Sequence, residues 1–97
     1  MQIHFNQFPD YQHGVEEFAN QQLQKLEKFG IPIEKAEVFY RHTASPDKPH
    51  EVEIKLAIPG QDLFAREGSD SFQKAFALCG DKLASQLSHR KRTGRQH

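Results

Sequence analysis

Basic side chains gather at the carboxyl end of this chain. Residues 82–97 contain five Lys or Arg and no Asp or Glu, whereas residues 1–81 contain eight basic and thirteen acidic side chains. A chain that is formally neutral therefore divides into a net charge of −5 and a net charge of +5. Long cationic side chains bind phosphate, and Arg adds bidentate geometry. The candidate phosphate ligands are Lys74, Lys82, His89, Arg90, Lys91, Arg92 and Arg95.

Such an asymmetry indicates a polyanionic partner, most often a nucleic acid. The alternative interpretation is a solvated basic tail that has no partner. No sequence-reading motif accompanies the basic residues, so the expected contact is with a nucleic-acid backbone and its shape.

The other reactive side chains form no recognisable catalytic or metal-binding motif. Six histidines are scattered, and no Cys/His cluster has the spacing of zinc ligands. Ser, His and Asp occur without a nucleophile elbow, and no glycine-rich loop has the form that cradles phosphate. Cys79 lies among helical apolar positions, which favours a buried small hydrophobic residue over a nucleophile. We therefore expect no enzyme activity, no cofactor, no metal and no small-molecule substrate.

The composition indicates a single soluble domain. Ninety-seven residues with many Leu, Ile, Val and Phe can form a core. No apolar run of about 20 residues could span a membrane, and the first residues lack the layout of a signal peptide. The single cysteine cannot form an internal disulfide. These features predict a cytoplasmic protein with one domain at residues 1–92 and a basic tail at residues 93–97.

Alternation of apolar and polar residues predicts four strands, at residues 2–8, 35–42, 51–58 and 63–67. The third has the clearest pattern, and its apolar face must be covered while its charged face can meet water. A turn-forming loop precedes it at residues 43–49, and a tight-turn signal follows it at residues 59–62.

Two amphipathic segments predict helices. The first begins near Asp10 and ends at Gly30, which is suited to the left-handed conformation of a helix end. The second begins at Asp70, which with Gln73 resembles a capping box, and continues to Arg92. A helical projection predicts a buried stripe of Phe72, Phe76, Cys79, Leu83 and Leu87, opposite an exposed stripe of Lys74, Lys82, Ser85, His89 and Arg92. Arg90 falls on the core side, so the helix is expected to have passed the sheet there.

These elements predict an α+β fold of order β-α-β-β-β-α. The first helix crosses between two parallel strands, the last three strands form an antiparallel meander, and both helices cover one face of a four-stranded mixed sheet in a two-layer sandwich. On the other face, Phe39 and Arg41 form a candidate secondary RNA contact by stacking and phosphate binding. The favoured alternative is that Phe39 packs under an edge or loop.

The order of elements and several motifs resemble the ribosome hibernation-promoting factors, also called ribosome-associated inhibitors, over essentially the whole chain. The most specific segments are residues 59–65, residues 67–72 and residues 81–87 with the basic end. Family members carry a similar turn, a Glu-Gly-x-Asp-x-aromatic helix start, and an Asp-Lys-Leu-x-x-Gln-Leu segment followed by basic residues. The chain resembles the short form of the family.

The resemblance implies a protein that binds the small ribosomal subunit and its 16S-type rRNA between head and body. There it would block the mRNA and tRNA channel in stationary phase or stress, without catalysis. Lys82 matches a helix lysine that faces rRNA, and residues 89–92 match the basic helix end. Ser85 stands where many members have Arg, which removes one expected phosphate contact. The alternative, suggested by the older description of family members as sigma-factor modulators, is a regulator that binds an acidic protein surface.

Overall fold

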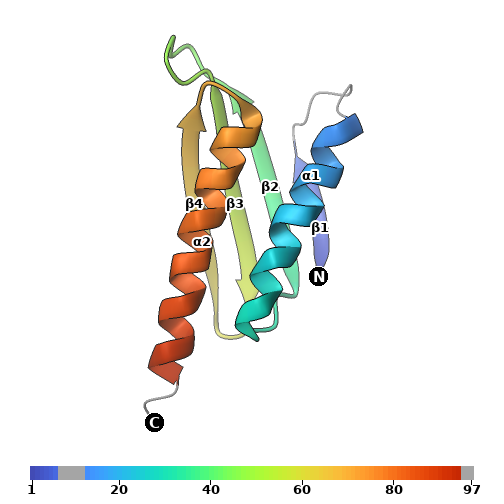
Figure 1. Ribbon diagram of the computed structural model, residues 1–97, viewed down its shortest axis with the longest axis vertical. Helices are drawn as coiled ribbons and strands as arrows, with labels where there is room; N and C mark the ends of the chain where they lie inside the picture. The colour runs from blue at the N-terminus through green and yellow to red at the C-terminus, as the bar shows by residue number, and fades with distance from the viewer. Residues whose placement is uncertain (7–12, 95–97) are drawn as a thin grey trace.

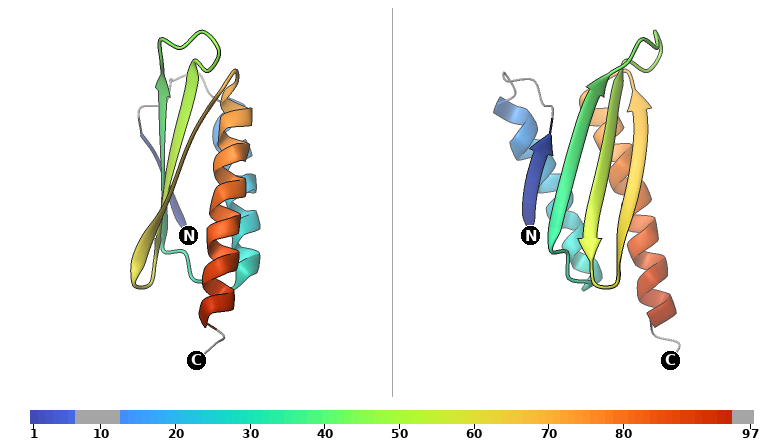
Figure 2. Two further views of the ribbon diagram at one scale, coloured as in Figure 1. Left: turned by 90° about the vertical axis from the view of Figure 1, so that its left-hand side faces the viewer. Right: turned by 180° about the vertical axis from the view of Figure 1, so that it is seen from behind.

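The computed structural model describes the backbone of residues 1–6 and 13–94 and the side chains of residues 1–6 and 14–90. The elements are β1 (Gln2–Asn6), α1 (His13–Gln24), the 3₁₀ helix η1 (Lys25–Phe29), β2 (Lys35–His42), β3 (His50–Ile58), β4 (Gln61–Ser69) and α2 (Phe72–Gly94). Both α-helices lie over the same face of the sheet (Figure 1). The side view shows the two layers (Figure 2). The predicted α+β sandwich is confirmed.

The sheet has the strand order β1-β2-β3-β4. β1 runs parallel to β2, with Gln2 opposite Lys35, and the other two neighbouring pairs are antiparallel. A parallel pair needs a crossover connection, which α1 provides. The predicted crossover and meander are therefore both confirmed.

The core lies between the sheet and the helices. Val52, Ile54 and Leu56 are fully buried on the helix-facing side of β3, as their alternation with charged residues predicts. All five predicted stripe residues of α2 are also buried. Phe76 meets Phe18 of α1 edge to face, with ring centroids 5.9 Å apart, so the two helices share one apolar seam. This burial fixes the rotation of α2 about its axis and thereby decides which of its residues reach solvent.

The bounds of β4 and the form of the last turn of the first helix differ from the sequence prediction. β4 spans Gln61–Ser69 and is longer than expected, because Gln61 already pairs with Ile58 across a loop of two residues. Gly60 in that loop has φ 88°, which suits the glycine position of a type II turn after proline. Gly30 has φ 74° and ends the first helical segment as predicted, but the last turn before it is 3₁₀ rather than α-helical. The predicted first-helix start at Asp10 lies outside the described residues.

The cap of α2 is Ser71, and the predicted capping box at Asp70 is wrong. The backbone N–H of Lys74 donates to Ser71 Oγ over 3.2 Å, which is the contact that an N-cap side chain makes with the third helical residue. The backbone N–H of Ala75 donates to the carbonyl of Ser71 over 3.1 Å, so the hydrogen bonds of the helix also begin at Ser71. None of the helices in residues 1–6 and 13–94 is long and apolar enough to cross a membrane.

Candidate nucleic-acid interface

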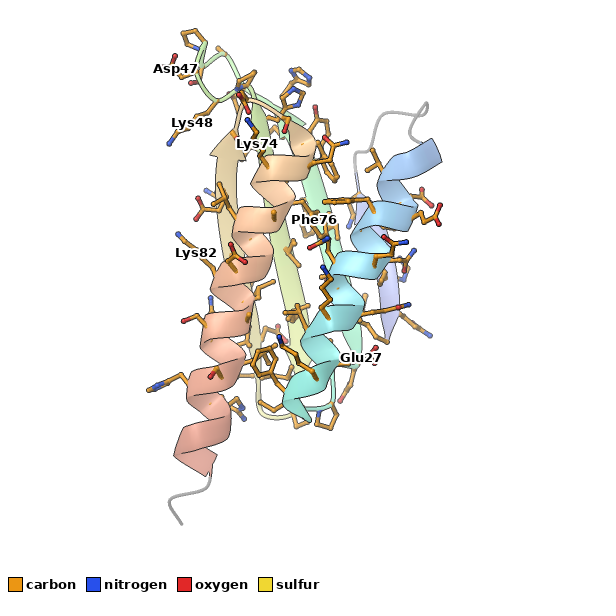
Figure 3. The ribbon with its side chains drawn as sticks, viewed as in Figure 1. Glu27, Asp47, Lys48, Lys74, Phe76 and Lys82 are labelled. Carbon is orange, nitrogen blue, oxygen red and sulfur yellow. The ribbon has the colours of Figure 1, made fainter. Side chains whose placement is uncertain are left out.

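The exposed side of α2 presents a row of polar and cationic residues. Lys74, Lys82, Ser85 and His89 are exposed, as the helical projection predicts. The side chains of Lys74 and Lys82 are 68% and 62% exposed, and both project from α2 in Figure 3. The apolar side chain of Leu78 interrupts the row and is 43% exposed.

Each of these two lysines forms an ion pair with a carboxylate. Lys74 Nζ lies 3.3 Å from Asp70 Oδ1, one helical turn earlier. Lys82 forms a short ion pair with Glu67, whose side chain is only 19% exposed on β4. The hydrogen bond that Lys82 donates to Glu67, followed by the negative charge of Glu67, raises the pKa of Lys82 above its ordinary value. Lys82 is therefore cationic at physiological pH, and a phosphate that binds it must compete with Glu67.

Lys48 is a cation near the amino-terminal end of α2 (Figure 3) that the sequence analysis missed. Its carbonyl accepts from Thr43 Oγ1 over 2.8 Å, and its N–H donates to Ser45 Oγ over 3.2 Å, so the loop holds its backbone. A Cβ built on Gly68 would lie 3.3 Å from Lys48 Cβ, which places Lys48 against the end of β4 that precedes α2. Figure 3 shows Lys48 at the same end of the molecule as Lys74. A turn-forming loop carries no sequence signal for this contact.

The carboxyl end of α2 projects beyond the sheet. Arg90 Nη2 donates to the carbonyl of Pro59 over 2.8 Å, so at Arg90 the helix is level with the turn between β3 and β4. The helix continues to Gly94, and its end passes the sheet in all three views of Figures 1 and 2. The predicted core-side position of Arg90 is confirmed, but the expectation that the helix has already passed the sheet at Arg90 is wrong, because Arg90 still contacts the turn between β3 and β4. The backbone of Lys91 and Arg92 is helical, whereas Arg95 lies outside the described residues.

The opposite face of the sheet carries balanced charge. Arg41 Nε donates to Glu51 Oε1 over 2.9 Å, and Phe39 and Arg41 line a hollow of about 120 Å³ together with Glu51 and Glu53. Two further cations on this face lie within ion-pair distance of acids: Lys55 with Glu37 and Asp62, and Arg66 with Glu53. Contact of RNA with Phe39 and Arg41 stays a prediction. Because acids and bases alternate on this face, we expect it to attract a polyanion less strongly than the exposed side of α2 does.

Cys79 is fully buried, which confirms its expected role as a small core residue. Its Sγ donates to the carbonyl of Val52 over 3.3 Å. Burial, followed by the charge of Glu67, raises its pKa from 9.0 to about 12, so the thiolate needed for nucleophilic attack is disfavoured. Among the described residues, His, Cys, Asp and Glu form no group of three that could hold a metal ion.

Comparisons with known proteins agree with this fold. A structure of a ribosomal subunit interface protein from Coxiella burnetii superposes with a TM-score of 0.76 at 23% sequence identity, covering 95% of this chain and 99% of that chain. The Protein Y N-terminal domain of Thermus thermophilus gives a TM-score of 0.74 at 16% identity, covering 91% of this chain and 93% of that chain. No curated protein sequence matches the chain.

Sequence comparison with family models identifies the chain directly. The family described as "Sigma 54 modulation protein / S30EA ribosomal protein" matches residues 1–95. The two solved structures support the same fold at identities too low to carry a function. The chain belongs to the sigma 54 modulation protein / S30EA ribosomal protein family.

Proposed function

We propose that this protein is a hibernation-type translation inhibitor that binds small-subunit ribosomal RNA through the exposed side and projecting end of α2. The observation that carries the proposal is the placement of the basic residues. The packing of α2 turns Lys74 and Lys82 outward, and the helix carries Lys91 and Arg92 past the sheet. The membership of the chain in an S30EA ribosomal protein family points to ribosomal RNA as the polyanion.

Each basic residue has a distinct part in this proposal. Lys74 and Lys82 exchange their carboxylate partners for phosphates, and Lys48 adds a cation at the same end of the molecule as Lys74. His89, Lys91 and Arg92 supply charge near the carboxyl end of α2, and Arg95, which lies outside the described residues, is a further candidate ligand. Arg90 is held by Pro59 and adds its charge from a fixed position. These contacts place the protein on RNA without reading sequence.

In this proposal the protein inhibits translation by occupying the decoding channel, without catalysing a reaction. The protein measures 46 × 24 × 18 Å along its principal axes, which is wider than a single RNA strand in every direction. A body of this size that is anchored by α2 in the decoding channel excludes mRNA and tRNA by steric overlap.

The test is a matched pair of neutralised cations. Lys82→Gln removes a cation that is 62% exposed and paired with a glutamate on the helix-facing side of β4. Arg66→Gln removes a cation that is 59% exposed and paired with a glutamate on the opposite face. We expect Lys82→Gln to weaken binding to isolated small subunits about three- to tenfold, whereas Arg66→Gln changes it less than twofold. Equal effects of the two variants would contradict an interface on α2.

Leu78 favours a second candidate function. A 43% exposed leucine between two lysines is of little use to a phosphate backbone but suits an acidic, partly apolar protein surface. The alternative is a regulator that binds such a protein with the same helix. Nuclease treatment of a captured complex separates the two functions, because only the first requires RNA.

A further inference from the structure

The last turns of α2 lack the apolar packing that holds the rest of the helix. Leu87 is fully buried, and none of the described side chains after it belongs to the hydrophobic core. The helix nevertheless continues to Gly94, which is about two further turns. Helix ends without tertiary contacts fray readily, and Ser88, Thr93 and Gly94 are weak helix formers. The order of this basic end therefore depends on contacts outside the core.

A groove separates this part of α2 from the edge of the sheet. It has a volume of about 330 Å³ and is lined by Gln61 and Leu63 of β4 and by Gln86, His89 and Arg90 of α2. Across an open groove, a helix and a strand lose the close side-chain contacts that hold packed elements together. Polar contacts are then needed to fix the helix to the sheet at this place.

Two hydrogen bonds connect the α2 side of the groove to the β3–β4 hairpin. Gln86 Nε2 donates to the carbonyl of Phe64 over 2.8 Å, and Arg90 Nη2 donates to the carbonyl of Pro59 over 2.8 Å. The two donors are four residues apart and therefore lie on the same side of the helix. Both acceptors are backbone groups, which the pairing of β3 with β4 holds in place. A Cβ on Gly60 would lie 3.4 Å from Arg90 Nη2, so the guanidinium also rests against the turn.

We propose that Gln86 and Arg90 are positioning residues, which hold the carboxyl end of α2 helical and fixed relative to the sheet before RNA binds. Lys91 and Arg92 follow directly on the helix, so the direction of their backbone depends on these two bonds. A segment that is frayed before binding loses conformational entropy when it binds, and a preformed helix avoids much of this cost. The proposal rests on the proposed function, because the preformed end matters only if it binds RNA. It also gives a role in binding to Gln86, which carries no charge.

Gln86→Met tests this role in the full chain. Gln86 is replaced rather than Arg90, because Arg90 also supplies charge. Methionine has a length and a helix propensity similar to those of glutamine, but it cannot donate to the carbonyl of Phe64. In the free variant, we expect the backbone amides of residues 88–94 to exchange hydrogen at least about fivefold faster than in the wild type, while residues 72–84 keep their protection. Hydrogen exchange followed by NMR measures both segments, and the thermal midpoint checks the fold.

The same variant should bind isolated small subunits about three- to tenfold more weakly, since the basic end must be ordered on binding. The slope of log affinity against log salt should stay unchanged, because no phosphate contact is removed. Gln73→Met is the matched control: Gln73 is an exposed glutamine in the first turn of the same helix. It should leave hydrogen exchange and binding unchanged.

A rescue separates positioning from direct contact with RNA. Ser88→Ala and Thr93→Ala favour the helix, so adding both to Gln86→Met should restore amide protection and bring the affinity to within about twofold of the wild type. If Gln86 bound RNA directly, these substitutions would restore the helix but not the affinity.

Unchanged hydrogen exchange in residues 88–94 of Gln86→Met would overturn the proposal, whether or not binding weakens. So would faster exchange with wild-type affinity, or a loss of affinity that the helix-favouring substitutions do not restore. Each of these outcomes overturns the positioning role alone. A wild-type protein that binds no small subunits would overturn the proposed function and this proposal with it.

Discussion

At the residue scale, the acid paired with a candidate phosphate-binding lysine matters as much as the lysine. Glu67 is largely buried and forms an ion pair with Lys82, so in the proposed complex it competes with RNA for the charge of Lys82. Sequence analysis identified Lys82 but not this pairing, because Glu67 and Lys82 belong to different elements and meet only through the packing of α2 on β4. The pairing of Lys74 with Asp70 is local and follows the spacing of helical neighbours.

Replacing Glu67 should strengthen RNA binding. Glu67→Gln removes the competing charge, so we expect small-subunit affinity to rise about two- to fivefold. The slope of log affinity against log salt should steepen by up to about 0.7, the value for one further phosphate contact on a single strand. Glu53→Gln is the matched control, because Glu53 pairs with Arg66 on the opposite face. Unchanged or weaker binding by Glu67→Gln would show that the acid positions Lys82 and does not compete for it.

The thiol of Cys79 makes stability depend on alkaline pH. Its pKa is about 12 in the folded protein and 9.0 ordinarily, so between these values the folded state retains a proton that the unfolded state loses. The free energy of unfolding therefore falls as pH rises from about 9. We expect the wild-type chain to lose more stability between pH 8 and about pH 10.5 than Cys79→Ala does, as measured by urea unfolding. Parallel losses in both proteins would exclude this role of the thiol.

At the element scale, the sequence predicted the four strands, the two α-helices and most of their bounds, because each has a strong hydrophobic period, but it did not predict the 3₁₀ helix η1. The prediction of the N-cap of α2 failed because two adjacent residues were both suitable as caps. Asp70 and Ser71 are each good caps, and in the structure it is Ser71 that accepts from the Lys74 N–H. Likewise, β4 extends beyond its predicted residues because hairpin pairing begins directly after Gly60.

Removing the observed cap should destabilise the protein. Ser71→Ala loses the oxygen that accepts from the Lys74 N–H, and we expect a cost of about 1 kcal/mol in the free energy of unfolding. Asp70→Ala loses an exposed ion pair and an exposed hydrogen bond from Ser69 Oγ, and should cost less than about 0.5 kcal/mol. Chemical denaturation of both variants checks this difference. A larger cost for Asp70→Ala would restore the capping box predicted from the sequence.

At the scale of the whole molecule, the fold separates two kinds of surface. One sheet face carries interleaved acids and bases, and α2 carries an exposed cationic row that ends beyond the sheet. The charge imbalance along the sequence predicted the second surface. Lys48, the pairing of Lys82 with Glu67 and the groove at β4 could not be predicted, because each depends on contacts between elements distant in sequence.

The most direct test of the central claim is co-sedimentation of the purified protein with vacant ribosomes and with separated subunits at low and moderate salt. We expect about one protein per small subunit at low salt, weaker binding at moderate salt, and displacement by mRNA or tRNA. Binding to large subunits alone would contradict the account. So would an absence of binding at low salt, or binding that mRNA and tRNA leave unchanged.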